Sequence, residues 1–137
     1  MIGIVLITHG GVGEELIATA ESIGCKLSRI QCVSINTEER EKVDKIRKAL
    51  AAAIKKADLG HGVLILTDMF GGTPSNISLS FLEEGKVEVL CGVNLPILMK
   101  LSGLREKGNL IELIKVLKDY GKKSIVLASD FLTGKEH

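Results

Sequence analysis

The sequence predicts an α/β fold, with an open, doubly wound and mostly parallel sheet of about five strands and helices on both faces. Short apolar runs alternate with longer amphipathic segments along the whole chain. Several of the apolar runs are hydrophobic at consecutive positions, which is typical of strands that are covered on both faces. Because strand and helix alternate, we expect right-handed crossovers between parallel strands.

Five short segments are expected to be strands, because they are rich in apolar and β-branched residues and are bounded by glycine or polar residues. They are IGIVLIT (2–8), IQCVSI (30–35), GVLILT (62–67), VEVLCG (87–92) and SIVLAS (124–129). In the usual flavodoxin-like strand order the first and third strands are neighbours. Their carboxyl ends would then lie side by side at one edge of the sheet.

The segments between these strands have helical periodicity and helix-terminating residues. The predicted helices are 12–24, 36–56, 73–85, 94–104 and 109–121. In the second of them, Glu38 and Glu39 lie in the first turn and lysines end the helix, as the helix dipole favours. The third is expected to begin with Thr73 as its N-cap and Pro74 at the first helical position, and to stop at Gly85.

Length and charge indicate one domain over residues 1–137 with a neutral exterior. The chain has 137 residues, of which 45% are hydrophobic, and a net charge of +1. Such a balance gives no general field for nucleic acid or an anionic membrane, so we expect neither as a partner. The first residues lack a basic leader, and no apolar run approaches the ~18 residues that span a bilayer. We therefore expect a soluble cytoplasmic protein.

Several common kinds of site are not indicated by the sequence. Cys25, Cys32 and Cys91 are odd in number and lack C-x-x-C spacing, which favours small buried thiols over a disulfide framework or a zinc site. The G-x-G-x-x-G pattern is incomplete, and G-x-x-x-x-G-K-[ST] and G-x-S-x-G do not occur. We expect no metal and no cofactor.

His9 is the first candidate for chemistry. It follows the first predicted strand and precedes a predicted helix, and helix N-termini attract anions. Gly10, Gly11 and Gly13 would allow backbone amides to approach a phosphoryl group closely. The alternative is that these glycines only form a tight turn. His61 precedes the third strand and is expected at the opposite edge, as a surface residue.

The loop TDMFGGTPSN (67–76) supplies a second set of candidates at the same predicted edge. Asp68 follows the third strand and could accept a hydrogen bond from one ring nitrogen of His9, which leaves the other nitrogen free to attack. Gly71, Gly72 and Thr73 would add amides and a hydroxyl for phosphate binding. The alternative for Asp68 is a turn or cap residue.

Met69 and Phe70 are apolar residues in the same loop. They could form part of a docking surface for a protein partner. The alternative is that both side chains are packed in the core. The terminal His137 is expected at the surface, in a charged and frayed tail.

Three motifs, GIVLITHG, GVLILTDMFGGTPSN and VEVLCGVNLPIL, together resemble the IIA component of the mannose family of the bacterial phosphoenolpyruvate-dependent sugar phosphotransferase system. The resemblance implies that His9 is phosphorylated by the histidine-containing phosphocarrier protein and then dephosphorylated by a IIB component. Asp68 matches the aspartate that partners this histidine, and Thr73 falls where the family has serine or threonine near the phosphate. The family also forms cytoplasmic homodimers.

The resemblance leaves the partners and the role partly open. Some members continue into a IIB domain, whereas this sequence ends at His137, so we expect a separate IIB acceptor and only indirect contact with membrane IIC and IID components. One alternative is a regulatory phosphoacceptor that uses His9 to bind a signalling partner without sugar flux. Another is the related subunit that serves dihydroxyacetone kinase, against which the DMFGGTPSN loop argues. The sugar itself cannot be deduced, because specificity lies with the membrane partners.

Overall fold

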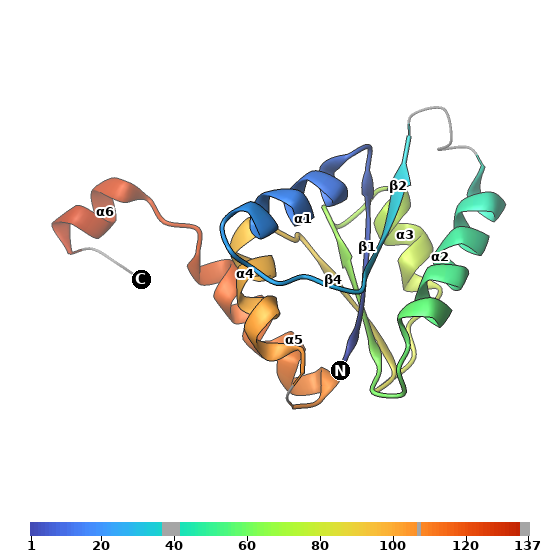
Figure 1. Ribbon diagram of the computed structural model, residues 1–137. Helices are drawn as coiled ribbons and strands as arrows, with labels where there is room; N and C mark the ends of the chain where they lie inside the picture. Colours follow the sequence, from blue (N-terminus) through green and yellow to red (C-terminus); the bar gives the residue numbers. More distant parts are fainter. Residues whose placement is uncertain (37–41, 107, 135–137) are drawn as a thin grey trace.

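Four parallel strands form the centre of the molecule, which is described by a computed structural model over residues 1–36, 42–106 and 108–134. The strands are β1 (Gly3–His9), β2 (Ile30–Ile35), β3 (Val63–Thr67) and β4 (Val87–Cys91). They lie in the order β2-β1-β3-β4, and every neighbouring pair is parallel (Figure 1). The predicted α/β class and the adjacency of the first and third strands are confirmed.

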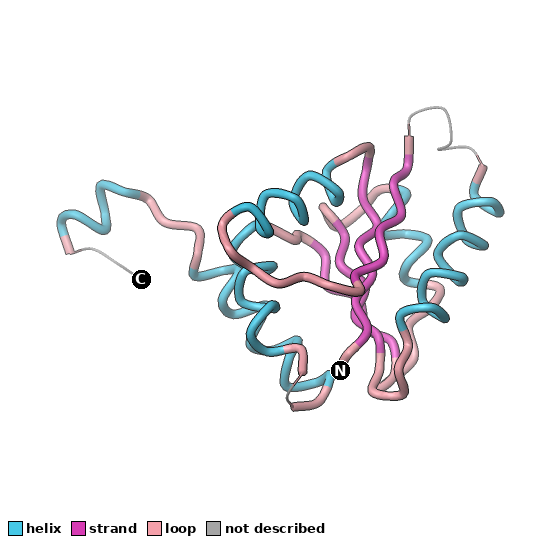
Figure 2. The backbone as a smooth tube through the Cα atoms, in the orientation of Figure 1, coloured by secondary structure: helices cyan, strands magenta, loops and turns pink. Residues whose placement is uncertain are grey.

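Helices cover both faces of the sheet, as the apolar strands require (Figures 1 and 2). On one face lie α1 (Val12–Ser22), α4 (Leu95–Leu104) and α5 (Leu110–Lys123). On the other lie α2 (Val43–Ala57) and α3 (Thr73–Leu79). The doubly wound arrangement places both helix layers around the two central strands, β1 and β3.

The core is divided by the sheet into two apolar clusters. Ile4 and Leu6 of β1 pack in the cluster under α1, α4 and α5, whereas Val5 and Ile7 pack in the cluster under α2 and α3. All four side chains are completely buried. Alternate residues of a strand point to opposite faces, so a strand that is covered on both sides needs apolar residues at consecutive positions. This is the pattern that the sequence contains.

The predicted fifth strand, residues 124–129, is wrong. Helix α5 continues to Lys123, and a short helix, α6 (Ala128–Thr133), follows it. Figure 1 shows α6 standing away from the sheet and from the other helices. The preference of valine and isoleucine for strands depends on neighbours to pack against. Although β4 is an edge strand, residues 124–129 do not pair with it, so the sheet has four strands among the described residues.

Helix α3 differs from the prediction at both ends. Gly72, with φ +120°, is the N-cap of α3, and Thr73 is its first helical residue. The turn needs a backbone conformation that glycine tolerates and threonine does not, so the cap falls one residue earlier. The same helix ends at Leu79 and does not reach Gly85. The predicted first-turn residues Glu38 and Glu39 lie outside the described residues.

Within the described ranges, no helix combines the length and apolar character needed to cross a bilayer.

Candidate functional site

The site is formed where β1 and β3 end. His9 is the last residue of β1, and Asp68 follows the last residue of β3. The two strands are paired in parallel register with Ile7 beside Thr67. Parallel neighbours end at the same edge of the sheet, and polar side chains just beyond that edge can meet. The predicted meeting of His9 and Asp68 is confirmed.

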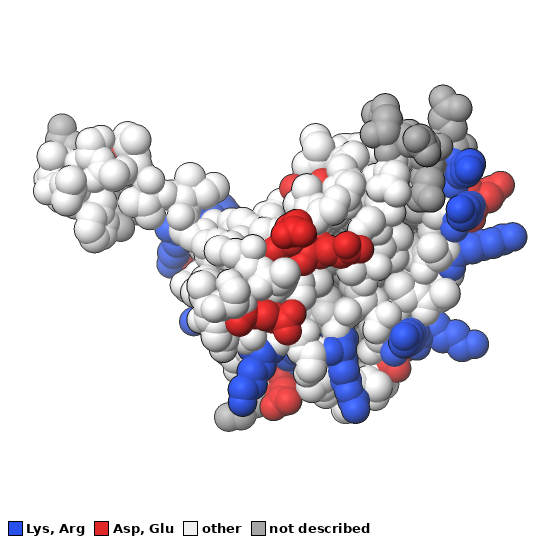
Figure 3. Space-filling view, turned by 45° about the horizontal axis from the view of Figure 1, so that its top comes forward, with Lys and Arg blue, Asp and Glu red and all other residues white. Residues whose placement is uncertain are grey.

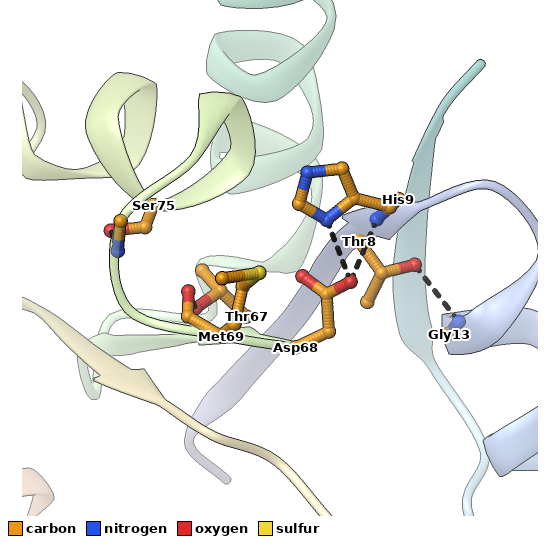
Figure 4. A network of polar contacts seen from close by, with 8 residues as sticks. Thr8, His9, Gly13, Thr67, Asp68, Met69 and Ser75 are labelled. Carbon is orange, nitrogen blue, oxygen red and sulfur yellow. Dashed lines mark hydrogen bonds and ion pairs between the residues drawn. The ribbon is translucent and has the colours of Figure 1, made fainter. Parts of the chain in front are cut away.

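One carboxylate oxygen of Asp68 contacts both the ring and the backbone N–H of His9. Asp68 Oδ2 lies 2.8 Å from His9 Nδ1 and also accepts a hydrogen bond from the His9 backbone N–H at 3.1 Å (Figure 4). A carboxylate can only accept, so Nδ1 carries the proton in this pair. In the neutral ring, Nε2 then has the free lone pair. The His9 side chain is 37% exposed and that of Asp68 only 16%, so the nucleophile is accessible while its partner is shielded.

The second oxygen of Asp68 strengthens the negative field beside the ring. Oδ1 is buried and has no hydrogen-bond partner among the described residues. No donor therefore offsets its partial charge, and in a poorly solvated place such a charge acts strongly on a neighbour. Positive charge that develops on the His9 ring is stabilised by this arrangement.

The backbone at Gly72 packs closely against the imidazole ring of His9. A Cβ atom at Gly72 would lie 3.2 Å from His9 Cε1 and 3.4 Å from Nε2. The backbone of the loop thus approaches the edge of the ring that bears the free lone pair, and only glycine permits this approach at φ +120°. Gly10, Gly11 and Gly71 have no atoms within 4 Å of an equivalent Cβ. A side chain at any of these three positions would therefore meet no neighbour, in contrast to one at Gly72.

A buried threonine sets the start of the first loop. Thr8 Oγ1 accepts a hydrogen bond from the backbone N–H of Gly13, at 2.9 Å, and Thr8 is fully buried (Figure 4). The bond ties the first turn of α1 to the end of β1. It thereby fixes the path of Gly10 and Gly11, which lie between these two anchored residues. The sequence signal was a polar residue at the last inward position of an otherwise apolar strand.

Two further buried hydroxyls shape the second loop. Thr67 Oγ1 donates to the carbonyl of Met69 at 3.1 Å, and Ser75 Oγ accepts from the N–H of Gly71 at 3.1 Å (Figure 4). Both Thr67 and Ser75 are fully buried. Neither was predicted to support the site. Their positions beside Asp68 and within the TPSN segment were the available signal.

The surface around the site combines apolar and acidic groups. Met69 and Phe70 are 51% and 75% exposed, so they are not core residues. Glu14 and Glu15 lie in the first turn of α1, and Ser34 Oγ donates to Glu14. Figure 3 shows acidic side chains grouped near the middle of the face drawn, with basic side chains along its margins. A partner surface that is apolar and basic would complement this composition.

The remaining predicted residues lie away from His9 or contribute differently. His61 lies at the opposite end of the strands, where they begin, and its Nδ1 is 3.3 Å from the Met1 amine. His137 lies outside the described residues. Thr73 begins α3, and its hydroxyl makes no hydrogen bond to another described residue. Among the described residues, no group of three or more His, Cys, Asp or Glu could hold a metal ion.

The cysteines are free, as predicted, but they are half-buried and not fully buried. Cys32, on β2, has its sulfur close to Gly13, where a Cβ would lie 2.9 Å from Sγ. Burial raises the pKa of the Cys32 thiol above its ordinary value, and the charge of Glu14 raises the pKa further. The thiol beside the loop of His9 is therefore held in its neutral form.

Sequence comparisons place the chain among sugar phosphotransferase components. The family model described as PTS system fructose IIA component, EIIA-man, matches residues 3–118, a range that includes His9 and Asp68. The fructose-specific EIIA component of Bacillus subtilis is 32% identical over 134 residues, covering 96% of this chain and 90% of that protein. The mannose-specific EIIAB component of Escherichia coli K12 is 29% identical over 126 residues, which cover 90% of this chain and 38% of that protein.

Solved structures with the same fold belong to the same system. The EIIA component from Streptococcus agalactiae superimposes with a TM-score of 0.82 at 25% identity, covering 94% of this chain and 98% of the other. The mannose/sorbose-specific IIA subunit from Enterococcus faecalis gives a TM-score of 0.79 at 26% identity, covering 92% and 93%. The similarity therefore extends over almost the whole of each chain.

Proposed function

This chain belongs to the EIIA-man family, the mannose-family IIA components of the sugar phosphotransferase system, and from that premise we propose that His9 carries its phosphoryl group. The observation that carries the proposal is the 2.8 Å contact of Asp68 Oδ2 with His9 Nδ1. It orients the ring so that the other nitrogen, Nε2, is the nucleophile. The donor is the histidine-containing phosphocarrier protein, and the acceptor is a separate IIB component in the cytoplasm.

The transfer is a displacement between two nitrogen atoms. The Nε2 lone pair of His9 forms a bond to phosphorus while the bond from phosphorus to the donor imidazole breaks, and the released electron pair returns to the donor ring. The proton on Nδ1 stays in its hydrogen bond to Asp68, whose charge balances the positive charge of the phosphorylated ring. Phosphoryl transfer depends mainly on positioning and charge stabilisation, so a fixed ring in an open site suits it.

The glycine loops are proposed to receive the phosphoryl oxygens. The N–H groups of Gly10 and Gly71 already donate to the Ile35 carbonyl and to Ser75 Oγ, so they shape the loops. The N–H groups of Gly11 and Gly72 make no hydrogen bond to another described residue and are the ones proposed to contact phosphate. Backbone N–H groups in such loops can approach phosphate without interference from side chains. Thr73, the first residue of α3, is proposed to offer its hydroxyl, which makes no hydrogen bond to another described residue, to the same group.

The test of the assignment is a phosphorylation assay with phosphoenolpyruvate, enzyme I and the phosphocarrier protein. We expect label on wild type and on His61→Ala, and none on His9→Ala. His61 is the matched control because it is a histidine at the opposite edge of the sheet. Label that persists in His9→Ala, or that disappears in His61→Ala, would remove His9 from the mechanism.

The role of Asp68 is tested by the single-turnover rate of transfer from the phosphocarrier. Asp68→Asn keeps the shape of the side chain but removes the charge that orients the ring and stabilises it once phosphorylated. We expect the rate to fall on the order of 10²-fold, with positioning by the loops retained. Circular dichroism should report an unchanged fold. A wild-type rate would show that Asp68 is only a turn residue.

We also propose a homodimer, in which the segment from Ile125 to Leu132 packs against a second copy. This segment stands away from the body in Figure 1 and exposes several apolar side chains, including Ile125 and Leu132, each 82% exposed. Strand β4 is an edge strand of the sheet, where only Val87 is bridged on the outer side among the described residues, by Glu83. Sedimentation should give a dimer for the full chain and a monomer after truncation at Ser124. A monomeric full chain at micromolar concentration would contradict the proposal.

A further inference from the structure

A hollow lies at the end of the molecule opposite His9. It measures about 230 Å³ and is lined by Arg29, Gln31, Lys56, Ala57, Leu59 and Arg105. These residues come from the start of β2, the end of α2 and the segment after it, and the residue that follows α4. The strands are parallel, so this hollow is at their amino ends. The seven residues of β1 separate it from His9 by roughly 20 Å.

The residues that line the hollow are rich in positive charge and include no carboxylate. Arg29, Lys56 and Arg105 are three of its six lining residues, and none of the other three is acidic. Arg29 and Lys56 form no ion pair or hydrogen bond with any other described residue. The heads of both side chains are therefore available to a ligand.

Arg105 adds a buried charge beneath these two side chains. It is only 4% exposed, and its Nη1 and Nη2 donate to the carbonyls of Ser28 and Ile2 at 2.5 and 3.3 Å. Both partners are neutral groups, and Nε is buried without a partner among the described residues. A buried cation that is bonded only to neutral groups keeps a strong outward field.

The charges of the hollow act on one another. Burial lowers the pKa of Arg105, the neighbouring Glu106 raises it, and Arg29 lowers it again through like-charge repulsion. Arg29 also has φ +62°, the only positive φ of a non-glycine among the described residues. That backbone conformation is unfavourable for an arginine, and such strain is a common feature of binding sites.

The presence of Lys56 in the hollow also has an explanation that involves no ligand. Lys55 and Lys56 both lie in the last turn of α2, where cations complement the helix dipole. Only Lys56 also lines the hollow. The dipole explains the presence of lysines there, but it does not explain the two arginines that meet Lys56 from other parts of the chain.

We propose that this hollow is a second ligand site, which binds the phosphate group of a small phosphate monoester or inorganic phosphate itself. Arg29 and Lys56 contact the phosphate oxygens, and Arg105 supplies a fixed positive field behind them. Gln31 and the aliphatic side chain of Leu59 border the space left for an organic part. A volume of about 230 Å³ suits a molecule no larger than a sugar phosphate. The proposal is independent of phosphorylation at His9.

The test is a titration of ¹⁵N-labelled protein followed by amide chemical shifts, in a His9→Ala background that removes the proposed phosphoryl site. The probes are inorganic phosphate, fructose 1-phosphate, fructose, and chloride at matched ionic strength. We expect saturable shifts at residues 29–31 and 56–59 with the two phosphates only. Tighter binding of fructose 1-phosphate would identify an organic ligand, whereas equal affinities would identify inorganic phosphate.

Substitutions then assign the binding to the hollow. The Arg29→Gln/Lys56→Gln double variant should bind phosphate at least about tenfold more weakly, because it loses two charge-assisted contacts. Lys55→Gln, which removes the same charge from the same helix end, should bind as wild type. Arg105 is left unchanged because its guanidinium also donates to the carbonyls of Ser28 and Ile2, so its loss would mix stability with binding. Equal shifts with chloride, shifts confined to residues 9–13 and 68–73, or unchanged affinity in the double variant would each overturn the proposal.

Discussion

Replacing Gly72 with alanine tests whether the packing of the Gly72 backbone against the His9 ring controls the rate of phosphoryl transfer. An added Cβ would lie 3.2 Å from Cε1, closer than most side-chain contacts, and 3.4 Å from Nε2, at the limit of ordinary van der Waals contact. The ring must then shift by a few tenths of an ångström, or the loop must move away. Either change disturbs the nitrogen that we propose as the nucleophile and the space around it. Errors of about 1 Å in positioning can cost on the order of 10²-fold in rate, so a shift of a few tenths of an ångström should cost roughly tenfold.

Stability must be separated from positioning, because Gly72 also has a backbone conformation that alanine adopts poorly. Gly72 has φ +120° and ψ 168°, a region nearly restricted to glycine, so strain of about 1–3 kcal/mol accompanies the substitution. Gly71 provides the matched control. Its φ is +80°, yet a Cβ there would meet nothing within 4 Å. Gly71→Ala should therefore lose stability but keep its transfer rate to within a few-fold.

The assay compares single-turnover phosphorylation of the two variants by the phosphocarrier protein, at a temperature where urea titrations show both to be folded. The ¹⁵N shifts of the His9 ring report which nitrogen carries the proton. Gly72→Ala should slow transfer and alter these shifts, whereas Gly71→Ala should do neither. Equal rates in the two variants, either both slow or both normal, would refute the reasoning that contact with the His9 ring is what Gly72 contributes.

Three further predictions concern stability. Thr8→Val leaves the Gly13 N–H without its buried acceptor, so urea titration should show a loss of about 1–3 kcal/mol in the free energy of unfolding; no loss would mean that water replaces the hydroxyl. Burial raises the pKa of Cys32 in the folded state above the unfolded value of about 8.5, so its contribution to stability is present below that pH and is lost as pH rises through the folded pKa. Urea titrations in neutral and alkaline buffer should show this decline in wild type and a smaller one in Cys32→Ala. Arg105→Met leaves two backbone carbonyls without their donors and should cost about 2 kcal/mol by the same titration, and a stabilised variant would contradict that role.

The sequence was sufficient for the class of fold and for the central pair of the site. Consecutive apolar residues in β1 and β3 require cover on both faces, and the alternation with amphipathic helices then leaves a parallel sheet as the solution. In such a sheet the residues that follow neighbouring strands share an edge. His9 and Asp68 could therefore be placed together before any distance was known, from local periodicity and chain connectivity together with the usual flavodoxin-like strand order.

The tertiary structure decided the features that depend on packing between distant segments. SIVLAS has the composition of a strand, but a strand also needs a paired neighbour, and this segment does not pair with the edge strand β4 and leads into α6 instead. The contact of Gly72 with the His9 ring and the meeting of Arg29, Lys56 and Arg105 likewise join segments that lie far apart in the sequence. Composition can state which residues are able to form strands, bind phosphate or turn the chain. Which of them come within contact distance is determined only when the two faces of the sheet are packed.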